Sequence, residues 1–296
     1  MIYQNILELI GNTPIVKLNK MFHYENVYAK FEGYNPIGSI KDRAVYQMIN
    51  DYLVEGKIKK GDTIIEATSG NTGIALASLA NYFGLHSIII MPLSSSVQRR
   101  ELIKAYGGEL VLINGGMKEC KEKAIELNNT IRNSIILNQF ENESNAKTHY
   151  LYTAKEIEKD LKDVDVIIVG IGTGGTISGI GKYFKENYPN VEIIGVEPKE
   201  SGLLTKGEIG QHKIQGIGPN FIPPILNRNV IDRIVSVTYK DSLLNCKTLT
   251  MLEGYLVGLS SGAVLEACNY ILKEEEYKNK KILLIFPDLG ERYSWN

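Results

Sequence analysis

Short apolar runs alternate with longer amphipathic stretches along most of the chain. Seven runs rich in β-branched residues are apolar at both alternating positions, which is typical of strands buried on both faces of a parallel sheet. They cover residues 27–31, 63–66, 87–91, 109–113, 166–169, 192–196 and 282–286. The stretches between them predict helices over residues 41–55, 73–82, 96–106, 117–129, 154–161, 177–187 and 262–274. This alternation predicts an α/β fold of open, mostly parallel sheets with helices on both faces.

The length of the chain, 296 residues, predicts two domains, because most domains hold about 100 to 200 residues. No Ser/Pro-rich linker divides the chain, so the boundary is expected to be a packed hinge near residues 142–146. The sequence therefore predicts an N-terminal domain over residues 1–145 and a C-terminal domain over residues 146–296.

Composition and charge exclude several classes of protein. Lys and Arg number 33 against 34 Asp and Glu, so the chain lacks the basic excess of a general nucleic-acid binder. Its three cysteines and four histidines form no CxxC, HExxH or clustered pattern, which argues against a disulfide framework and a metal site. The first residues lack the apolar core of a signal peptide, and no apolar run is long enough to cross a bilayer. We therefore expect a cytoplasmic protein with no membrane partner.

The first of four turns that suit chemistry spans residues 35–43. A Pro/Gly turn follows the predicted strand 27–31, Ser39 can cap, and a helix begins near Lys41. The positive end of a helix disfavours a protonated amine, which suits a nucleophilic lysine or one that forms a Schiff base. A solvated lysine beside Asp42 is the alternative at this turn.

The second turn, residues 66–73, reads Glu-Ala-Thr-Ser-Gly-Asn-Thr-Gly and leads from a buried strand into an apolar helix. Backbone N–H groups and short hydroxyls at a helix N-terminus make an anion site. No phosphate-scale charge lies nearby in the sequence, so a carboxylate is the expected guest. An ordinary capped turn is the alternative.

The third turn, residues 170–176, reads Gly-Ile-Gly-Thr-Gly-Gly-Thr and again joins a strand to a helix. Glycine lets the backbone approach an oxyanion, and the helix dipole favours negative charge. The spacing matches neither a Walker A loop nor a clean GxGxxG fingerprint. It therefore predicts a phosphate cradle without implying a dinucleotide.

The fourth turn, residues 258–262, places Ser260 and Ser261 before a helix, where either is an ordinary N-cap. In a doubly wound sheet, however, ligands bind outside the carboxyl ends of parallel strands, so all four turns face one crevice. A lysine for an aldehyde, a glycine loop for a phosphate, a carboxylate site and a spare hydroxyl together match one cofactor, pyridoxal 5′-phosphate.

This combination resembles the cysteine synthase (O-acetylserine sulfhydrylase) and cystathionine β-synthase family of pyridoxal-phosphate enzymes. The segments that carry the resemblance occur in family order at residues 12–14, 35–43, 68–73, 172–176, 212–218, 260–262 and 287–293. The resemblance implies fold type II, similar to the tryptophan synthase β chain: two open-sheet α/β domains with the cofactor in the cleft between them. It also implies a homodimer, and no C-terminal regulatory module or N-terminal haem segment is expected.

The resemblance further implies a role for each motif. Lys41 looks like the lysine that holds the cofactor as an internal aldimine and acts as general base. Asn71 would bond the ring hydroxyl, and Ser260 would meet the pyridine nitrogen. The phosphate loop would consist of Gly172, Thr173, Gly174, Gly175 and Thr176. The residues that bind the amino-acid substrate and its carboxylate would be Thr68, Ser69, Gly70, Thr72, Gln139 and Gly216.

The implied activity is β-replacement or β-elimination on a small amino acid through an aminoacrylate. A serine at the pyridine nitrogen makes the ring a weaker electron sink, which favours this chemistry over transamination. The family default is cysteine synthesis from O-acetylserine and sulfide. The alternative is a cysteine lyase, such as a cysteine (hydroxyl) lyase, which releases hydrogen sulfide from cysteine and forms serine, lanthionine or cystathionine with water or a thiol.

Departures from the family pattern bear on the leaving group and the nucleophile. They lie at residues 152–157, at residues 219–223 and at Asp288. Asp232 is the first acid after the substrate-side loop, and in the cleft it would activate water or a hydroxyl leaving group; a strand-edge aspartate is the alternative. From a different class, a non-catalytic phosphometabolite binder would use the glycine loop but would not need Lys41.

Overall fold

A computed structural model of the chain describes residues 2–23, 25–293 and 295. These residues form two compact units, of which unit 1 comprises residues 1–40 and 146–296 and unit 2 comprises residues 41–145. Residues 1–40 therefore lie with the C-terminal half of the chain rather than in the domain of residues 1–145 that the sequence suggested. The physical reason is strand pairing, since the strand of residues 26–31 lies beside that of residues 281–286.

Unit 1 is built on a six-stranded sheet with the order β1-β2-β10-β7-β8-β9. All neighbours are parallel except β1 and β2, which pair antiparallel. The strands are β1 (Ile15–Lys17), β2 (Asn26–Phe31), β10 (Lys281–Phe286), β7 (Val166–Gly170), β8 (Glu192–Pro198) and β9 (Arg233–Val237).

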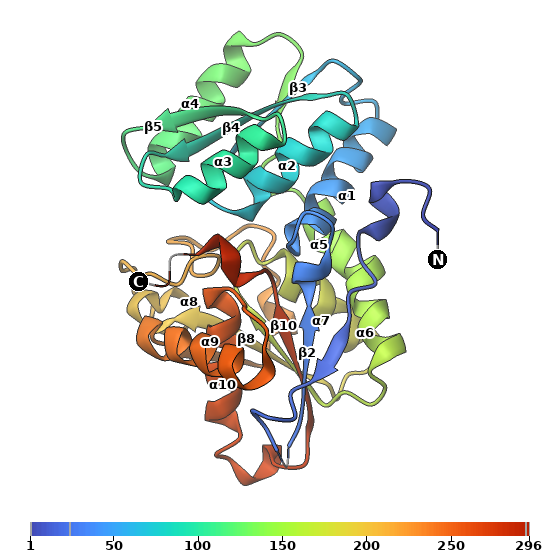
Figure 1. The fold of residues 1–296 in the computed structure, drawn as a ribbon, viewed down its shortest axis with the longest axis vertical. Coiled ribbons are helices and arrows are strands. Elements are labelled where there is room, and N and C mark those ends of the chain that lie inside the picture. The colour runs from blue at the N-terminus through green and yellow to red at the C-terminus, as the bar shows by residue number, and fades with distance from the viewer. Residues whose placement is uncertain (1, 24, 294, 296) are drawn as a thin grey trace. The chain divides into compact units, whose positions relative to one another are not determined.

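Helices cover both faces of this sheet, as Figure 1 shows. Val166 and Ile168 of β7 pack into the same core cluster as α10, whereas Ile167 and Val169 pack into the cluster that holds α6 and α7. Burial on both faces explains why the strand is apolar at every position. The helices are α5 (Ser144–Thr148), α6 (Ala154–Asp160), α7 (Gly175–Asn187), α8 (Leu203–Lys206), α9 (Tyr239–Glu253) and α10 (Leu259–Ile271).

Unit 2 contains a four-stranded, fully parallel sheet with the order β5-β4-β3-β6. Helix α4 packs on one face through Cys120 and Ala124, and α2 packs on the other. The strands are β3 (Thr63–Ala67), β4 (His86–Pro92), β5 (Glu109–Ile113) and β6 (Ser134–Ile136). The helices are α1 (Lys41–Val54), α2 (Asn71–Tyr82), α3 (Val97–Ala105) and α4 (Met117–Thr130).

Short helical turns complete the fold at Ile6–Leu9, Glu32–Tyr34, His149–Thr153, Lys199–Ser201, Arg228–Val230, Glu275–Tyr277 and Gly290–Arg292. The α/β prediction is confirmed, because all seven expected strands are present and the sheets are mostly parallel. The three cysteines, Cys120, Cys246 and Cys268, are buried free thiols. Within the described ranges, no helix has both the length and the apolar character needed to span a bilayer.

Candidate active site

The glycine loop of unit 1 lies between the end of β7 and the start of α7. Gly174 caps the helix with φ at 87°, a left-handed conformation that favours glycine. A Cβ on Gly172 would lie 2.3 Å from the carbonyl oxygen of Gly216, so that position has no room for a side chain. The first N–H groups of α7 have no carbonyl partner within the helix and carry its positive dipole end, so the loop suits a phosphate.

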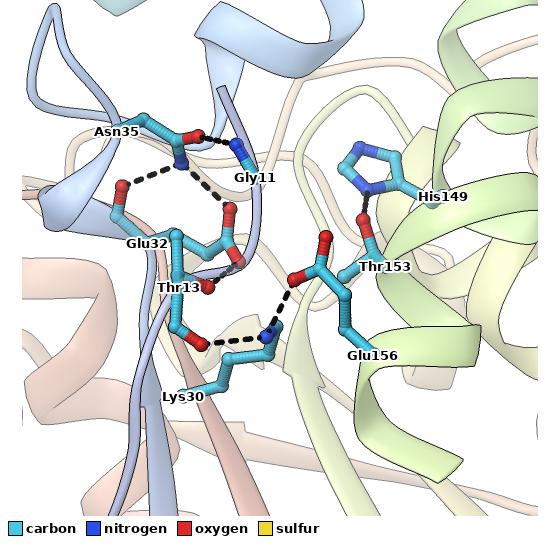
Figure 2. Close-up of polar contacts among 8 residues, drawn as sticks. All are labelled: Gly11, Thr13, Lys30, Glu32, Asn35, His149, Thr153 and Glu156. Carbon is cyan, nitrogen blue, oxygen red and sulfur yellow. Dashed lines mark hydrogen bonds and ion pairs between the residues drawn. The ribbon is translucent and has the colours of Figure 1, made fainter. Parts of the chain in front are cut away.

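A buried histidine lies against this loop and was not singled out from the sequence. The imidazole of His149 is 3.3 Å from the hydroxyl of Thr176 through Nε2 and 3.0 Å from that of Thr153 through Nδ1. Figure 2 shows the second of these contacts. A lone histidine within no motif carries no local signal, so only the fold could reveal its place beside Thr176.

Ser260 joins the same side of unit 1. It lies in the first turn of α10 and is 2% exposed. A Cβ on Gly216, which has φ at 95°, would lie 3.8 Å from the Ser260 hydroxyl oxygen. Gly216 therefore contacts both Gly172 and the neighbourhood of Ser260, and the structure brings these three sequence-predicted positions together.

The backbone that leads to Lys41 is held firmly within unit 1. The Ile40 N–H donates to the carbonyl of Pro287 at 2.8 Å, and the Arg292 guanidinium donates to the carbonyl of Ile37. Lys41 itself is half-buried and is the first residue of α1. The position at a helix N-terminus is the one that the sequence predicted for a reactive amine.

A buried polar network supports the same segment from the other side (Figure 2). The Glu32 carboxylate accepts hydrogen bonds from the Thr13 hydroxyl at 2.6 Å and from the Asn35 amide at 2.9 Å. Asn35 in turn accepts from the Gly11 N–H at 2.8 Å. The Lys30 ammonium donates to the Thr13 carbonyl at 3.0 Å and pairs with Glu156 at 2.8 Å. Charged residues in an apolar strand, as in Val-Tyr-Ala-Lys-Phe-Glu, were the available signal for this network.

The predicted carboxylate site lies in unit 2, at the carboxyl end of β3. Helix α2 begins at Asn71, after the N-cap Gly70. The Thr68 hydroxyl accepts from the Gly70 N–H at 3.2 Å, and the Ser69 carbonyl accepts from Arg99 at 3.2 Å. These contacts hold the loop that leads into the helix, whose positive dipole end favours an anion.

Gln139 reaches this loop from the segment after β6. Its side-chain oxygen accepts from the Thr72 hydroxyl at 2.6 Å, so the structure brings together two residues that are 67 positions apart. The Gln139 amide nitrogen donates to Glu66 at 2.9 Å. Glu66 was not named as a site residue, although a glutamate in the buried run Thr-Ile-Ile-Glu-Ala was visible in the sequence. Burial raises the pKa of Glu66 to about 7.

Asp232 is not placed with these residues. Its carboxylate accepts from the Ile193 N–H at 2.7 Å and pairs with Lys185 at 2.6 Å. Ile193 lies at the amino end of β8, whereas the glycine loop follows the carboxyl end of β7, and these neighbouring strands run parallel. Asp232 and a molecule bound at the loop would therefore lie at opposite ends of these strands. The distance between the two ends is about 16 Å for a strand of five residues. Asp232 binds the amino end of β8 and does not lie at the glycine loop, which corrects the expectation that it enters the site.

Comparison with known proteins places the chain in a family. The model of the family described as pyridoxal-phosphate dependent enzyme matches residues 6–288. The chain is 48% identical over 295 residues to cysteine synthase B of Campylobacter jejuni, covering 99% of this chain and 97% of that protein. It is 44% identical over 296 residues to a cysteine synthase of Staphylococcus aureus, covering 98% and 94%. The chain therefore belongs to the pyridoxal-phosphate-dependent enzymes, and within them it groups with the cysteine synthases.

A solved structure supports the same assignment. The hydrogen sulfide-producing enzyme of Fusobacterium nucleatum superposes with a TM-score of 0.96 at 43% identity, covering 99% of this chain and 100% of that one. The fold is thus that of the fold type II pyridoxal-phosphate enzymes, and the cofactor is pyridoxal 5′-phosphate.

The residues of unit 1 fit this cofactor. A phosphate suits the start of α7 because Gly172 and Gly174 let the loop pack closely against Gly216 and Leu226, and the N–H groups at the positive end of the helix favour an anion. Ser260 offers a neutral hydroxyl at the start of α10, which suits a pyridine nitrogen that is not protonated. In the described residues, no group of three or more His, Cys, Asp or Glu side chains is arranged to hold a metal ion.

Proposed function

We propose that the chain catalyses β-replacement on O-acetylserine, with sulfide as the nucleophile, and produces cysteine and acetate. The observation that carries this proposal is the 48% identity with a cysteine synthase over 99% of the chain. In this reaction the bond between the β-carbon and the acetate oxygen breaks, and a bond between the β-carbon and sulfur forms.

Unit 1 holds the cofactor in this proposal. Residues 172–176 bind the phosphate through N–H groups and hydroxyls, and His149 orients the hydroxyl of Thr176. When bound, pyridoxal phosphate withdraws electrons from the α-carbon of the amino acid. Because a serine hydroxyl at position 260 cannot keep the ring nitrogen protonated as an aspartate would, loss of a β-substituent is favoured over transamination.

Unit 2 supplies the proton transfers and the substrate carboxylate site. The amine of Lys41 would hold the aldehyde of the cofactor and, with the substrate bound, would take the proton from the α-carbon. Acetate then leaves with the bonding electrons, hydrosulfide adds to the β-carbon, and Lys41 returns a proton to the α-carbon. Asn71 bonds the ring hydroxyl. The substrate carboxylate is bound by Thr68, Ser69, Gly70, Thr72 and Gln139, and Gly216 is proposed as a further residue that binds the substrate.

A second candidate is the release of hydrogen sulfide from cysteine, with formation of serine or a thioether. It is favoured by the similarity to the hydrogen sulfide-producing enzyme of Fusobacterium nucleatum and by the residue at position 288. Asp288 is 2% exposed and accepts a hydrogen bond from the Tyr293 hydroxyl at 2.6 Å. A Cβ on Gly258, the N-cap of α10, would lie 2.0 Å from its Oδ1, so this carboxylate packs against the turn that presents Ser260.

Two assays on the purified protein separate these reactions. Cysteine formation from O-acetylserine and sulfide is expected to exceed sulfide release from cysteine; the reverse order favours the second candidate. The protein should also show the absorbance of a lysine-bound pyridoxal, and Lys41→Ala should abolish both this absorbance and turnover. A colourless protein that takes up no pyridoxal phosphate would contradict the proposal and favour a phosphometabolite binder.

We also propose that the enzyme acts as a homodimer in the cytoplasm. The dimer follows from its family, and the cytoplasm from three free cysteines that suit a reducing compartment. Light scattering of the purified protein checks the first point: a mass of about 33 kDa, that of one chain, would contradict it. Fractionation of cells that express the native chain checks the second.

A further inference from the structure

Glu66 lies beneath the carboxylate loop and is almost fully buried, with 2% of its surface exposed. Its Oε1 accepts a hydrogen bond from the Gln139 side-chain nitrogen at 2.9 Å, and its Oε2 accepts from the Asn138 N–H at 2.8 Å. Among side chains of this size, only an ionised carboxylate accepts on both oxygens. The site is thus matched to a glutamate in its charged form.

This pairing fixes the direction of the Gln139 amide. Because the nitrogen is turned toward Glu66, the oxygen is turned toward Thr72 and accepts its hydroxyl proton at 2.6 Å. The main-chain carbonyl of Gln139 is held as well, since it accepts from Asn145 at 2.8 Å. Glu66, Gln139 and Thr72 therefore form a row of hydrogen bonds that all run in one defined direction.

The amide nitrogen of Gln139 carries two hydrogens, of which Glu66 takes one. The second is the one that a ligand at the carboxylate loop would accept. A hydrogen bond to a charged acceptor is short and strong, so the ionised Glu66 keeps the amide from rotating. With a neutral side chain at position 66, Asn138 and Gln139 would compete for a single oxygen, and the polarity of the row would reverse.

We propose that Glu66 is a positioning residue for the amino-acid substrate: it acts through Gln139 to aim the amide that binds the substrate carboxylate. The inference rests on the proposed function, because it assumes that an amino acid binds at Thr68–Gly73. Glu66 touches neither substrate nor cofactor in this role.

The test is a double-mutant cycle on the full-length holoenzyme. Glu66→Gln should raise KM for the amino acid about tenfold, which corresponds to about 1.4 kcal/mol of binding free energy. The value of kcat should change much less. In the Gln139→Ala background, the same substitution should leave KM unchanged, because its effect passes through Gln139. Dissociation constants from the change of cofactor absorbance on titration with the amino acid should follow KM.

Glu141→Gln is the matched control. Glu141 lies in the same segment and is exposed, and it accepts from the Asn138 side chain rather than from Gln139. It should keep the wild-type KM. An unchanged KM in Glu66→Gln, or a tenfold effect that persists without Gln139, would overturn the proposal, whereas a wild type inactive with both O-acetylserine and cysteine would overturn the proposed function itself.

The wild-type protein provides a second measurement that needs no variant at position 66. KM should rise as the pH falls below about 7, the pKa to which burial raises Glu66, and Gln139→Ala should lack this change. Lys121 of α4 lowers this pKa. Burial and the charge of Glu66 raise the pKa of Tyr52 of α1 above its ordinary value of 10.0, so this phenol stays neutral in the pH range of the test. A KM independent of pH in this range, with constant cofactor absorbance, would contradict the role of the carboxylate.

Discussion

Gly174 and Gly207 both have a positive φ, but only Gly174 is closely surrounded by other residues. Substitutions at the two positions therefore distinguish the effect of backbone strain from the effect of a distorted loop. Gly174 has φ at 87°, and an added Cβ would lie 3.0 Å from the Leu226 Cα. Gly207 has φ at 73°, and among the described residues no atom lies within 4 Å of an added Cβ. The left-handed conformation costs an L-residue about 1–2 kcal/mol at either position.

Gly174→Ala should therefore bind pyridoxal phosphate at least about tenfold more weakly, because the added Cβ must push the loop away from Leu226. A cost of about 1.4 kcal/mol for this movement is enough to weaken binding tenfold. Gly207→Ala should lose some stability but keep its cofactor affinity. Titration of the apoenzymes with pyridoxal phosphate measures both. Equal affinities in the two variants would show that the loop tolerates a side chain at position 174.

The buried carboxyl of Glu66 makes stability depend on pH. Burial raises its pKa from 4.5 to about 7, so the folded state binds a proton between these values that the unfolded state has released. The free energy of unfolding must then fall as the pH rises through this window, by an order-of-magnitude total of about 3 kcal/mol.

Glu66→Gln cannot ionise at this position and should lack that fall. The difference in unfolding free energy between wild type and variant should thus shift in favour of the variant from pH 4.5 to above pH 7. Urea titrations at several pH values measure it. A difference that stays constant with pH would mean that the carboxyl titrates with its ordinary pKa.

At the scale of elements, the pair of Lys30 and Glu156 joins β2 to α6. The Lys30 side chain is fully buried and that of Glu156 is 12% exposed. Lys30→Met removes the charge while keeping most of the volume, and it should cost about 3–5 kcal/mol of stability because Glu156 keeps a charge that this partner balanced.

Lys57→Met provides the comparison. Lys57 pairs with Glu55 at 2.7 Å, but both side chains are more than half exposed, so its loss should cost less than about 1 kcal/mol. Chemical denaturation of both variants measures the difference. A loss below about 1 kcal/mol in Lys30→Met as well would show that the network of Figure 2 contributes little to stability.

The strands that could be predicted from the sequence are those with a long apolar run, whether they are buried on both faces or, like the edge strand β5, only partly buried. All seven expected strands are apolar at nearly every position, and each is present. The strands β1 and β6 have three residues each, too few for a period to show. β9 (Arg233–Val237) begins with an arginine and alternates half-buried with buried positions, as suits an edge strand. Strands as short as β1 and β6, or as polar as β9, take their identity from their partners, which a local pattern cannot show.

The site was predictable for a similar reason. Glycine and hydroxyl clusters at strand ends mark turns locally, so the strand-to-helix turns at residues 68–72 and 172–176 could be expected, while their roles as binding sites stay predictions. His149, Glu66 and Lys30 act through partners distant in sequence, such as Thr176, Gln139 and Glu156. Asp232 was misplaced because adjacency in sequence to the substrate-side loop does not reveal which end of a parallel strand a residue occupies.

At the scale of the whole molecule, the chain passes from unit 1 to unit 2 and back, at residues 40–41 and 145–146. Unit 2 contains all four strands of its own sheet. A fragment of residues 41–145 should therefore fold alone, with a dispersed amide spectrum in nuclear magnetic resonance.

A fragment of residues 1–145 should gain nothing from its extra 40 residues. Its β1 and β2 form a hairpin that lacks β10, with which β2 pairs along six residues, and an isolated hairpin is marginal in water. Its added signals should be those of an unfolded chain. A fragment of residues 1–145 more stable than 41–145 would contradict the division into units.

The burial of all three cysteines has a consequence for an enzyme that handles reduced sulfur. Cys120, Cys246 and Cys268 are each 0% exposed, and desolvation raises the pKa of the Cys246 thiol to about 12. Exchange with persulfides or mixed disulfides requires an accessible thiolate. Polysulfides, which arise when oxygen oxidises sulfide, therefore find no accessible thiolate among the three cysteines of the folded chain, so its mass should stay constant during turnover in air.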